Sequence, residues 1–280
     1  MQTILVRYSE IGLKSRPVRK RFETQLKDNI MKMLAADGIE ALVTSDTSRL
    51  YVSAEDTGKA VRSVRRVFGV ASLSVAEICG SPMKEICEAA AKYSVTRIKK
   101  GQSFAVRARR EGDHPYNSME LGREAGSAIF LANEGINVNL TDPDVTFYIE
   151  VRNNKAFIFG SYIKAHAGFP LGSQGKVIAE VNDERGLLSA WLMMKRGCRA
   201  IVHGNYDLSM LRAFDPSLKI VGNDEKGRCL KDVLGNVLGT PLEGSVRIDM
   251  SEYDVPVYFP TVGMSDSEVS EMLKDLRSEI

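Results

Sequence analysis

The sequence predicts two α+β units followed by a doubly wound α/β unit. Within residues 1–72 the strand and helix patterns follow the order β-α-β-β-α-β, and a second mixed group runs to residue 168. From residue 169 onward, short apolar strands alternate with amphipathic helices, which is typical of a mostly parallel sheet. A chain of 280 residues is long enough for three such parts. We therefore predict domains at 1–72, 73–168 and 169–280.

The first unit is predicted from one long amphipathic helix and the short elements around it. Ser15 and Pro17 are suited to a helix start, and Gly38 is suited to its end. Between them, apolar residues recur every four positions and define one buried face: Val18, Phe22, Leu26, Ile30 and Leu34. The strands are expected at 2–8, 40–44, 49–54 and 71–78, and the second helix at 56–68. This order is the ferredoxin-like arrangement.

The second unit is predicted to be another compact α+β group. Its helices are expected at 82–98 and from Asn117 to Ala132, and Asn117 with Glu120 has the spacing of a capping box. The strands are expected at 103–109, 137–140, 145–152 and 155–162.

The third unit follows a turn-rich segment, 167–176, that contains several glycines and a proline. Ser265 and Glu268 form a capping box for the last helix. The strands are expected at 177–181, 199–203, 218–221, 245–249 and 255–259, and the helices at 184–196, 207–214, 228–238 and 266–277. Their alternation predicts the doubly wound sheet.

Composition narrows the class of protein. Hydrophobic residues make up 44% and charged residues 26% of the chain, which is ordinary for a globular protein. No apolar run approaches the roughly 20 residues of a membrane span, and the first residues lack the pattern of a secretion signal. The four cysteines are scattered without a C-x-x-C pair, which argues against a disulfide scaffold and a zinc ribbon. We expect a cytoplasmic protein with reduced cysteines, without a membrane and without a bound metal.

Charge is distributed unevenly along the chain. Residues 1–72 hold 13 Lys and Arg against 8 Asp and Glu, and residues 73–168 hold 12 against 11. Residues 169–280 hold 13 against 17. A polyanion would therefore favour the N-terminal part of the chain and be repelled by the C-terminal part.

Two basic clusters are candidate nucleic-acid contacts. The first cluster opens the long N-terminal helix, where unpaired backbone N–H groups also attract anions; it consists of Lys14, Arg16, Arg19, Lys20 and Arg21. The second lies on and before the strand 103–109, whose alternation places arginines on the face opposite Phe104; it consists of Lys99, Lys100, Arg107, Arg109 and Arg110. Each cluster fits a phosphate backbone, and each also fits an ordinary solvated face.

Two catalytic patterns are not supported. The sequence Gly175-Lys176 ends a glycine-rich stretch, but that stretch precedes a strand, and Val177 stands where a phosphate-binding loop needs Ser or Thr. His114, His166 and His203 lie far apart in the sequence and form no recognisable metal-binding or triad spacing. We therefore assign no catalytic residue, no cofactor site and no metal site.

Several segments together resemble one known family. These are residues 8–16 with 19–22, 104–110, 117–118, 138–140, 142–144, 168–177, 192–197 and 256–264. In this order they resemble the tRNA 4-thiouridine synthetases, the ThiI-type sulfurtransferases, with a THUMP domain in the middle. The resemblance spans nearly the whole chain. It implies binding of tRNA by the first two domains and a nucleotide-hydrolase-like third domain.

One segment departs from that family. A pyrophosphatase-type loop of the form S-G-G-x-D-S is expected before the Met193-Met194-Lys195 helix, and its small residues let backbone amides surround ATP phosphates. Here residues 180–186 offer one glycine and three carboxylates, which repel phosphate. The resemblance with this departure predicts a tRNA-binding protein that lacks ATP-dependent activation. Two alternatives stay open: an active sulfurtransferase using ATP and Mg²⁺ at a divergent site, and a protein-binding scaffold. A protein partner or a homodimer also stays open.

Overall fold

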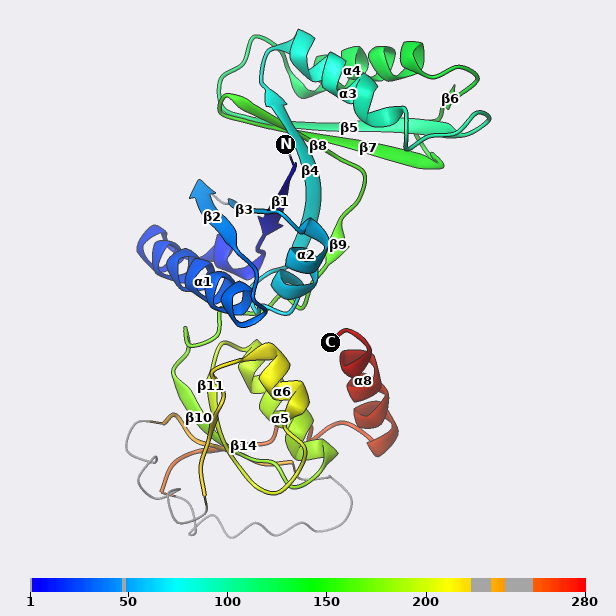
Figure 1. Cartoon of the computed structure of the whole chain (residues 1–280). Helices are drawn as coiled ribbons and strands as arrows, with labels where there is room; N and C mark the ends of the chain where they lie inside the picture. The colour runs from blue at the N-terminus through cyan, green and yellow to red at the C-terminus, as the bar shows by residue number, and fades with distance from the viewer. Residues whose placement is uncertain (1, 47–48, 223–232, 240–253) are drawn as a thin grey trace. The chain divides into compact units, whose positions relative to one another are not determined.

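The computed structural model describes residues 2–46, 49–222, 233–239 and 254–280 (Figure 1). The chain divides into two compact units, each made of several segments. Unit 1 consists of Met1–Val6, Tyr51–Thr57 and Leu73–Ile163, and unit 2 consists of Arg7–Leu50, Gly58–Ser72 and Lys164–Ile280. The predicted domain boundaries after residues 72 and 168 stay predictions.

The first elements confirm the β-α-β-β-α-β order. They are β1 (Gln2–Arg7), η1 (Glu10–Leu13), α1 (Arg16–Ala36), β2 (Ala41–Asp46), β3 (Arg49–Ala54), α2 (Thr57–Arg65) and β4 (Ser72–Gly80). The helix α1 has Pro17 in its first turn, and Gly38 follows it with a φ of +69°, a left-handed conformation that favours glycine. Its predicted buried face is confirmed at Phe22, Leu26 and Ile30. The short 3-10 helix η1 was not predicted.

Unit 1 is a sheet with two helices packed on one face (Figure 1). Its strand order is β3-β1-β4-β8-β7-β5-β6. The further elements are α3 (Met83–Ser94), β5 (Ser103–Glu111), α4 (Ser118–Ala132), β6 (Asn137–Val138), β7 (Val145–Arg152), β8 (Lys155–Phe159) and, at the unit's end, β9 (Ile163–Lys164). The predicted capping box of Asn117 and Glu120 is present at the start of α4. The core lies between helices and sheet, where Ile86 and Leu121 meet Phe104 and Phe147.

In the C-terminal part of unit 2, the described residues form a parallel five-stranded sheet of order β12-β11-β10-β13-β14. Its elements are β10 (Lys176–Glu180), α5 (Glu184–Lys195), β11 (Arg199–His203), α6 (Ser209–Phe214), β12 (Lys219–Ile220), β13 (Asn236–Val237), β14 (Val257–Tyr258) and α8 (Asp266–Ser278). The strands β11 and β12 are added on one side of β10, and the later strands β13 and β14 are added on its other side. The predicted α/β unit is therefore confirmed, and this reversal is the place where such sheets bind ligands.

One predicted element of this sheet is wrong in part. The helix expected at 228–238 cannot extend through Asn236 and Val237, because these residues form β13 and pair with β10. The glycines at 235 and 239 on either side favour a short buried strand over a helix end. The described residues 233–235 and 238 are not helical either, whereas residues 228–232 of that helix and the strand expected at 245–249 lie outside the described residues.

Unit 2 joins segments far apart in the sequence through one aromatic core. The ring of Phe68, three residues beyond α2, stacks on Phe214 at 5.3 Å and meets Trp191 edge-on at 5.4 Å. Phe22 of α1 meets Phe169 edge-on at 5.8 Å. Because Phe22, Phe68, Trp191 and Phe214 are buried and Phe169 is half-buried, the N-terminal helices depend on the C-terminal part of unit 2 for much of their packing.

Candidate nucleic-acid interface

The start of α1 is open to an anion. Ser15 is the N-cap, but its side chain accepts no hydrogen bond from the helix, and the first turn contains no carboxylate. Three cations of the predicted cluster, Arg16, Lys20 and Arg21, are exposed. The positive end of the helix dipole and these side chains therefore act in the same direction on a phosphate.

Arg19 has a different role from its neighbours. It is half-buried, and its Nη2 donates to the carbonyl of Gly12 at 2.6 Å and to that of Lys14 at 3.3 Å. Its guanidinium therefore holds the turn of η1 against the start of α1. Lys14 is also engaged, since its Nζ lies 4.9 Å from the centre of the Phe169 ring. The sequence pattern could not separate these two from the exposed cations.

The second cluster lies on β5 of unit 1. Phe104 is buried, whereas Arg107, Arg109 and Arg110 are exposed, as strand alternation predicted for the first two arginines. Arg107 donates to the carbonyl of Leu140, and Arg110 donates to that of Gly112 at 2.7 Å. These contacts fix the two guanidinium groups near the surface without neutralising their charge.

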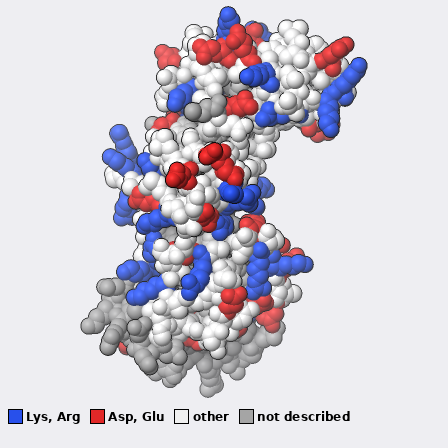
Figure 2. Space-filling view, viewed as in Figure 1, with Lys and Arg blue, Asp and Glu red and all other residues white. Residues whose placement is uncertain are grey.

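The lysines before β5 are also exposed. Lys99 and Lys100 form the turn into the strand, and Gly101 N donates to Gly135 O at 2.8 Å. The side chain of Lys100 lies over Gly135, where an added Cβ would come within 2.9 Å of it. On the face shown in Figure 2, Lys and Arg side chains project into solvent with Asp and Glu among them. The candidate contacts on this face are therefore local clusters of cations.

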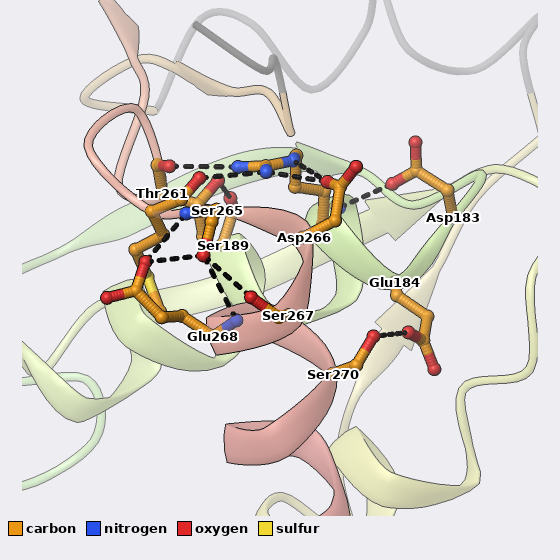
Figure 3. A network of polar contacts seen from close by, with 12 residues as sticks. Asp183, Glu184, Ser189, Thr261, Ser265, Asp266, Ser267, Glu268 and Ser270 are labelled. Atoms are coloured by element: carbon orange, nitrogen blue, oxygen red, sulfur yellow. Dashed lines mark hydrogen bonds and ion pairs between the residues drawn. The ribbon is translucent and has the colours of Figure 1, made fainter.

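The start of α5 differs from that of α1 because its own residues close it (Figure 3). Asp183 is the N-cap, and its carboxylate accepts from Gly186 N at 2.7 Å. The second carboxylate, Glu184, accepts from Ser270 at 2.9 Å and from Arg277 at 3.0 Å. These two hydrogen bonds hold the pKa of Glu184 below its usual value, so the group stays negative.

Arg185 anchors the following chain beside this helix start. Its side chain is 8% exposed and donates to the carbonyls of Thr261 at 3.0 Å and Met264 at 2.8 Å. It also forms an ion pair with Asp266 at 2.7 Å. The neighbouring carboxylates Asp183 and Glu184 are both engaged elsewhere. Helix propensity could not reveal a partner 81 residues away.

The backbone segments that follow β13 and β11 also pack closely against the start of α5 and the residues before it. A Cβ added at Gly239, just after β13, would lie 2.2 Å from Gly186 N. One added at Gly204, after β11, would lie 2.2 Å from the carbonyl of Val181. The backbone segments on either side of the reversal point between β10 and β13 are therefore closely packed.

The histidines and cysteines lie in separate surroundings. His114 stacks on Tyr116 at 5.5 Å, and His166 lies among Phe68, Trp191 and Phe214. Burial raises the pKa of the Cys79 thiol to about 11, and burial also raises the pKa of Cys87 and Cys198. Among the described residues, no three metal-ligating side chains of the His, Cys, Asp or Glu type converge.

No described helix is both long enough and apolar enough to cross a membrane.

Family models match the two N-terminal parts of the chain. The ThiI ferredoxin-like domain matches residues 3–74, and the THUMP domain matches residues 81–160. The chain is thus a THUMP-domain protein with a ThiI-type ferredoxin-like domain before it.

Relatives extend this similarity. A probable tRNA sulfurtransferase of Methanosarcina acetivorans is 37% identical over 202 residues, which are 69% of this chain and 48% of that protein. One of Thermococcus kodakarensis is 29% identical over 337 residues, covering 98% of this chain and 87% of that protein. The chain spans about half the length of the curated relatives it matches first. It resembles the tRNA sulfurtransferases beyond the two matched domains.

Solved structures share the fold. The crystal structure of PH1313 from Pyrococcus horikoshii has a TM-score of 0.86 at 28% identity and covers 99% of this chain and 100% of its own. A 4-thiouridine synthetase solved as an RNA complex with bound ATP has a TM-score of 0.79 at 20% identity, with 100% and 86% covered. The second likeness concerns the fold alone.

Proposed function

We propose that this protein binds tRNA through its ferredoxin-like and THUMP parts and does not activate the tRNA with ATP. The observation that carries the second half is the closed start of α5. There, Asp183 caps the helix, Arg185 anchors the 261–266 segment, and Gly239 packs on Gly186 N.

Binding of tRNA is supported by chemistry and by relatives. Arg16, Lys20 and Arg21 surround an open helix start, and Arg107 and Arg109 lie on an exposed strand face. Such cations neutralise phosphates without reading base edges. The THUMP match and relatives named tRNA sulfurtransferases make tRNA the preferred RNA.

Activation of a uridine needs a triphosphate held with its α-phosphorus facing the base oxygen, and the charge that builds on pyrophosphate must be stabilised. Backbone amides at a helix start are the usual donors for this task. At α5 the carboxylate of Asp183 already accepts from the amide of Gly186, and Glu184 adds a second negative charge. A phosphate would have to displace one carboxylate and approach another.

The test is calorimetric titration of the full-length protein with ATP and Mg²⁺, together with a thiolation assay on a tRNA transcript with a sulfur donor. We expect no binding tighter than roughly 100 µM, about −5.5 kcal/mol, and no 4-thiouridine. Titration with the same tRNA at low salt serves as the positive control, because a folded preparation should bind it.

Two alternatives give different results in these assays. An active sulfurtransferase with a divergent ATP site, favoured by the names of the relatives, predicts ATP binding and 4-thiouridine. A scaffold that binds only proteins predicts no affinity for tRNA even at low salt. Crosslinking in the native cell extract, followed by sequencing of the bound RNA, would identify the RNA directly.

A further inference from the structure

Unit 2 contains a pocket of about 500 Å³ beside the last turn of α5. This is within the usual range for sites that hold a small ligand. It is separate from the closed start of α5, because it is formed at the other end of that helix, where the helix faces β14 and the turn at Gly168. Its lining residues are Glu10, Gly168, Leu192, Met193, Lys195, Arg196, Tyr258, Phe259 and Pro260.

One side of the pocket is aromatic. The side chain of Tyr258 is 37% exposed, and Phe259 beside it is half-buried. The Tyr258 ring is supported from behind by Gly235, where an added Cβ would lie 2.6 Å from Cε2. A tyrosine that is held in place and still exposed offers a rigid surface on which a planar group can stack.

The opposite side carries cations. Arg196 is exposed at the end of α5, and its guanidinium makes no hydrogen bond or ion pair with any residue that the structure describes. Lys195 is turned inward, with its Nζ 5.4 Å from the Trp191 ring centre. Lys14 lies over Phe169, next in the chain to the pocket residue Gly168. Arg196 thus places an exposed positive charge in the same pocket as the aromatic residues Tyr258 and Phe259.

A third feature is the carboxylate of Glu10 on η1. It is half-buried at the pocket edge, and a carboxylate at such a place accepts hydrogen bonds from amino groups. The turn at Gly168 brings this edge close to α5, because the φ of Gly168 is +79° and an added Cβ would lie 2.1 Å from Lys195 O. An aromatic plane, the exposed guanidinium of Arg196 and a carboxylate acceptor therefore line one cavity.

We propose that this pocket holds one unpaired nucleotide of the bound RNA, with its base stacked on Tyr258 and its phosphate paired with Arg196. This inference rests on the proposed tRNA binding. A base in a duplex cannot enter, because stacking on a side chain requires an unstacked base. Glu10 favours a base with an exocyclic amine. The basic start of α1 supplies the electrostatic attraction that single-stranded binding sites combine with such stacking.

The experiment measures the affinity of the full-length protein for a fluorescent tRNA transcript. We expect Tyr258→Ala to weaken binding roughly tenfold, in line with the measured effect of losing one base–aromatic stack. Tyr258→Phe keeps the ring and should bind like the wild type. Arg196→Ala should weaken binding and lower the salt slope by about one, whereas the matched Arg212→Ala, on α6 away from the pocket, should change neither.

A second measurement does not depend on the folding of any variant. Ultraviolet crosslinking of the wild-type protein to the same tRNA, followed by peptide mass spectrometry, should attach a nucleotide to the peptide that contains Tyr258. The proposal is overturned if Tyr258→Ala binds like the wild type, if Tyr258→Phe is as weak as Tyr258→Ala, or if the crosslinks avoid this peptide.

Titration with free AMP and UMP separates the two sources of a nucleotide. Tight binding of either one, lost in Tyr258→Ala while tRNA affinity is unchanged, would assign the pocket to a free nucleotide and overturn the RNA proposal. A wild-type protein without tRNA affinity would refute the proposed function, and this inference with it. ATP binding that is retained in Tyr258→Ala would be assigned to a site other than this pocket. It would contradict only the proposal that the protein does not activate tRNA with ATP.

Discussion

Unit 2 contains two helix starts with opposite charge: cations follow the start of α1, whereas carboxylates lie at the start of α5. At α1, Ser15 leaves its side chain unused and the exposed cations Arg16, Lys20 and Arg21 follow. At α5, Asp183 bonds the amide of Gly186, and the guanidinium of the buried Arg185 is directed to another segment. Both helices have the same dipole, so the dipole alone does not make a phosphate site.

The difference lies in what surrounds the free amides. A helix start binds an anion only if its N–H groups are accessible and no fixed negative charge precedes them. The start of α1 meets both conditions. The start of α5 meets neither, because Gly239 covers the amide of Gly186 and two carboxylates lie in the turn. At this position of the sheet, Arg185 ties the start of α5 to the 261–266 segment.

Among the changes that test the two helix starts, deletion of residues 169–280 should have the largest effect on folding and on RNA affinity. The distribution of positive charge alone would favour a 1–168 fragment that folds by itself and keeps tRNA affinity within about tenfold. The packing opposes this, because Phe68 would lose Trp191 and Phe214, and Phe22 would lose Phe169. We now expect α1 and α2 to lose their cooperative thermal transition, measured by circular dichroism, and the open helix start to lose its RNA affinity.

A shorter fragment provides the control for that deletion. Residues 73–163 contain the core of Ile86, Leu121 and Phe147, and this core needs no residue of unit 2. The fragment should retain helical signal even where the 1–168 fragment does not. A cooperative transition of the whole 1–168 fragment, with tRNA affinity near that of the full chain, would contradict the dependence of α1 on the C-terminal sheet.

Arg185→Ala should have the second-largest effect. It leaves the carbonyls of Thr261 and Met264 without their donor, and unpaired buried acceptors cost about 1–3 kcal/mol each. We expect the free energy of unfolding to fall by about 2–4 kcal/mol in urea denaturation. Arg212→Ala, which changes an exposed arginine of α6, should cost under about 0.5 kcal/mol. Equal stability of both variants would mean that Arg185 does not hold the 261–266 segment against α5.

The cations of α1 provide the third prediction. Arg16, Lys20 and Arg21 are exposed, so changing all three to Ala should weaken binding to many RNAs alike and lower the salt slope by up to about three units. Arg19→Ala should chiefly lower stability, since Arg19 braces η1. Loss of affinity for a single RNA sequence, with an unchanged slope, would instead indicate base readout. Changing Arg107, Arg109 and Arg110 together to Ala tests the basic cluster on β5 by the same measurements of affinity and salt slope.

Much of this fold was predictable from local pattern. The four-residue repeat of Phe22, Leu26 and Ile30 predicted α1, and strand alternation predicted which side of β5 carries Arg107. The capping boxes at Asn117 and Ser265 predicted the starts of α4 and α8. These features depend on neighbours within a few residues, which a sequence displays directly.

The remaining features depend on long-range contacts. The bond of Arg185 with Thr261 spans 76 residues and that of Asn29 with Leu171 spans 142. No periodicity predicts such pairs. For the same reason the strand β13 was mistaken for helix, since its pairing with β10 decides its conformation. The sequence identified the basic clusters but could not distinguish the brace Arg19 from its exposed neighbours.

The smallest expected effect concerns His166, which lies in the aromatic core that joins α2 to α5 and the C-terminal end. Burial lowers its pKa, and Lys195 and Arg65 lower it further, while Glu279 opposes the shift. The Nε2 atom lies 3.0 Å from a Glu279 carboxylate oxygen but makes no hydrogen bond with it, so the attraction of Glu279 does not offset burial.

A histidine with a lowered pKa takes up its proton in the unfolded chain first. Its contribution to stability is therefore complete above the unfolded value of about 6.5 and is lost as the pH falls below it. We expect the stability advantage of the wild type over His166→Gln, measured by urea denaturation, to shrink from pH 7.5 to pH 5. Glu279→Gln removes the charge that raises this pKa, so the loss should still begin near pH 6.5 but should extend to lower pH and become larger. An advantage that grows on acidification would mean that the Glu279 pair, and not burial, controls His166.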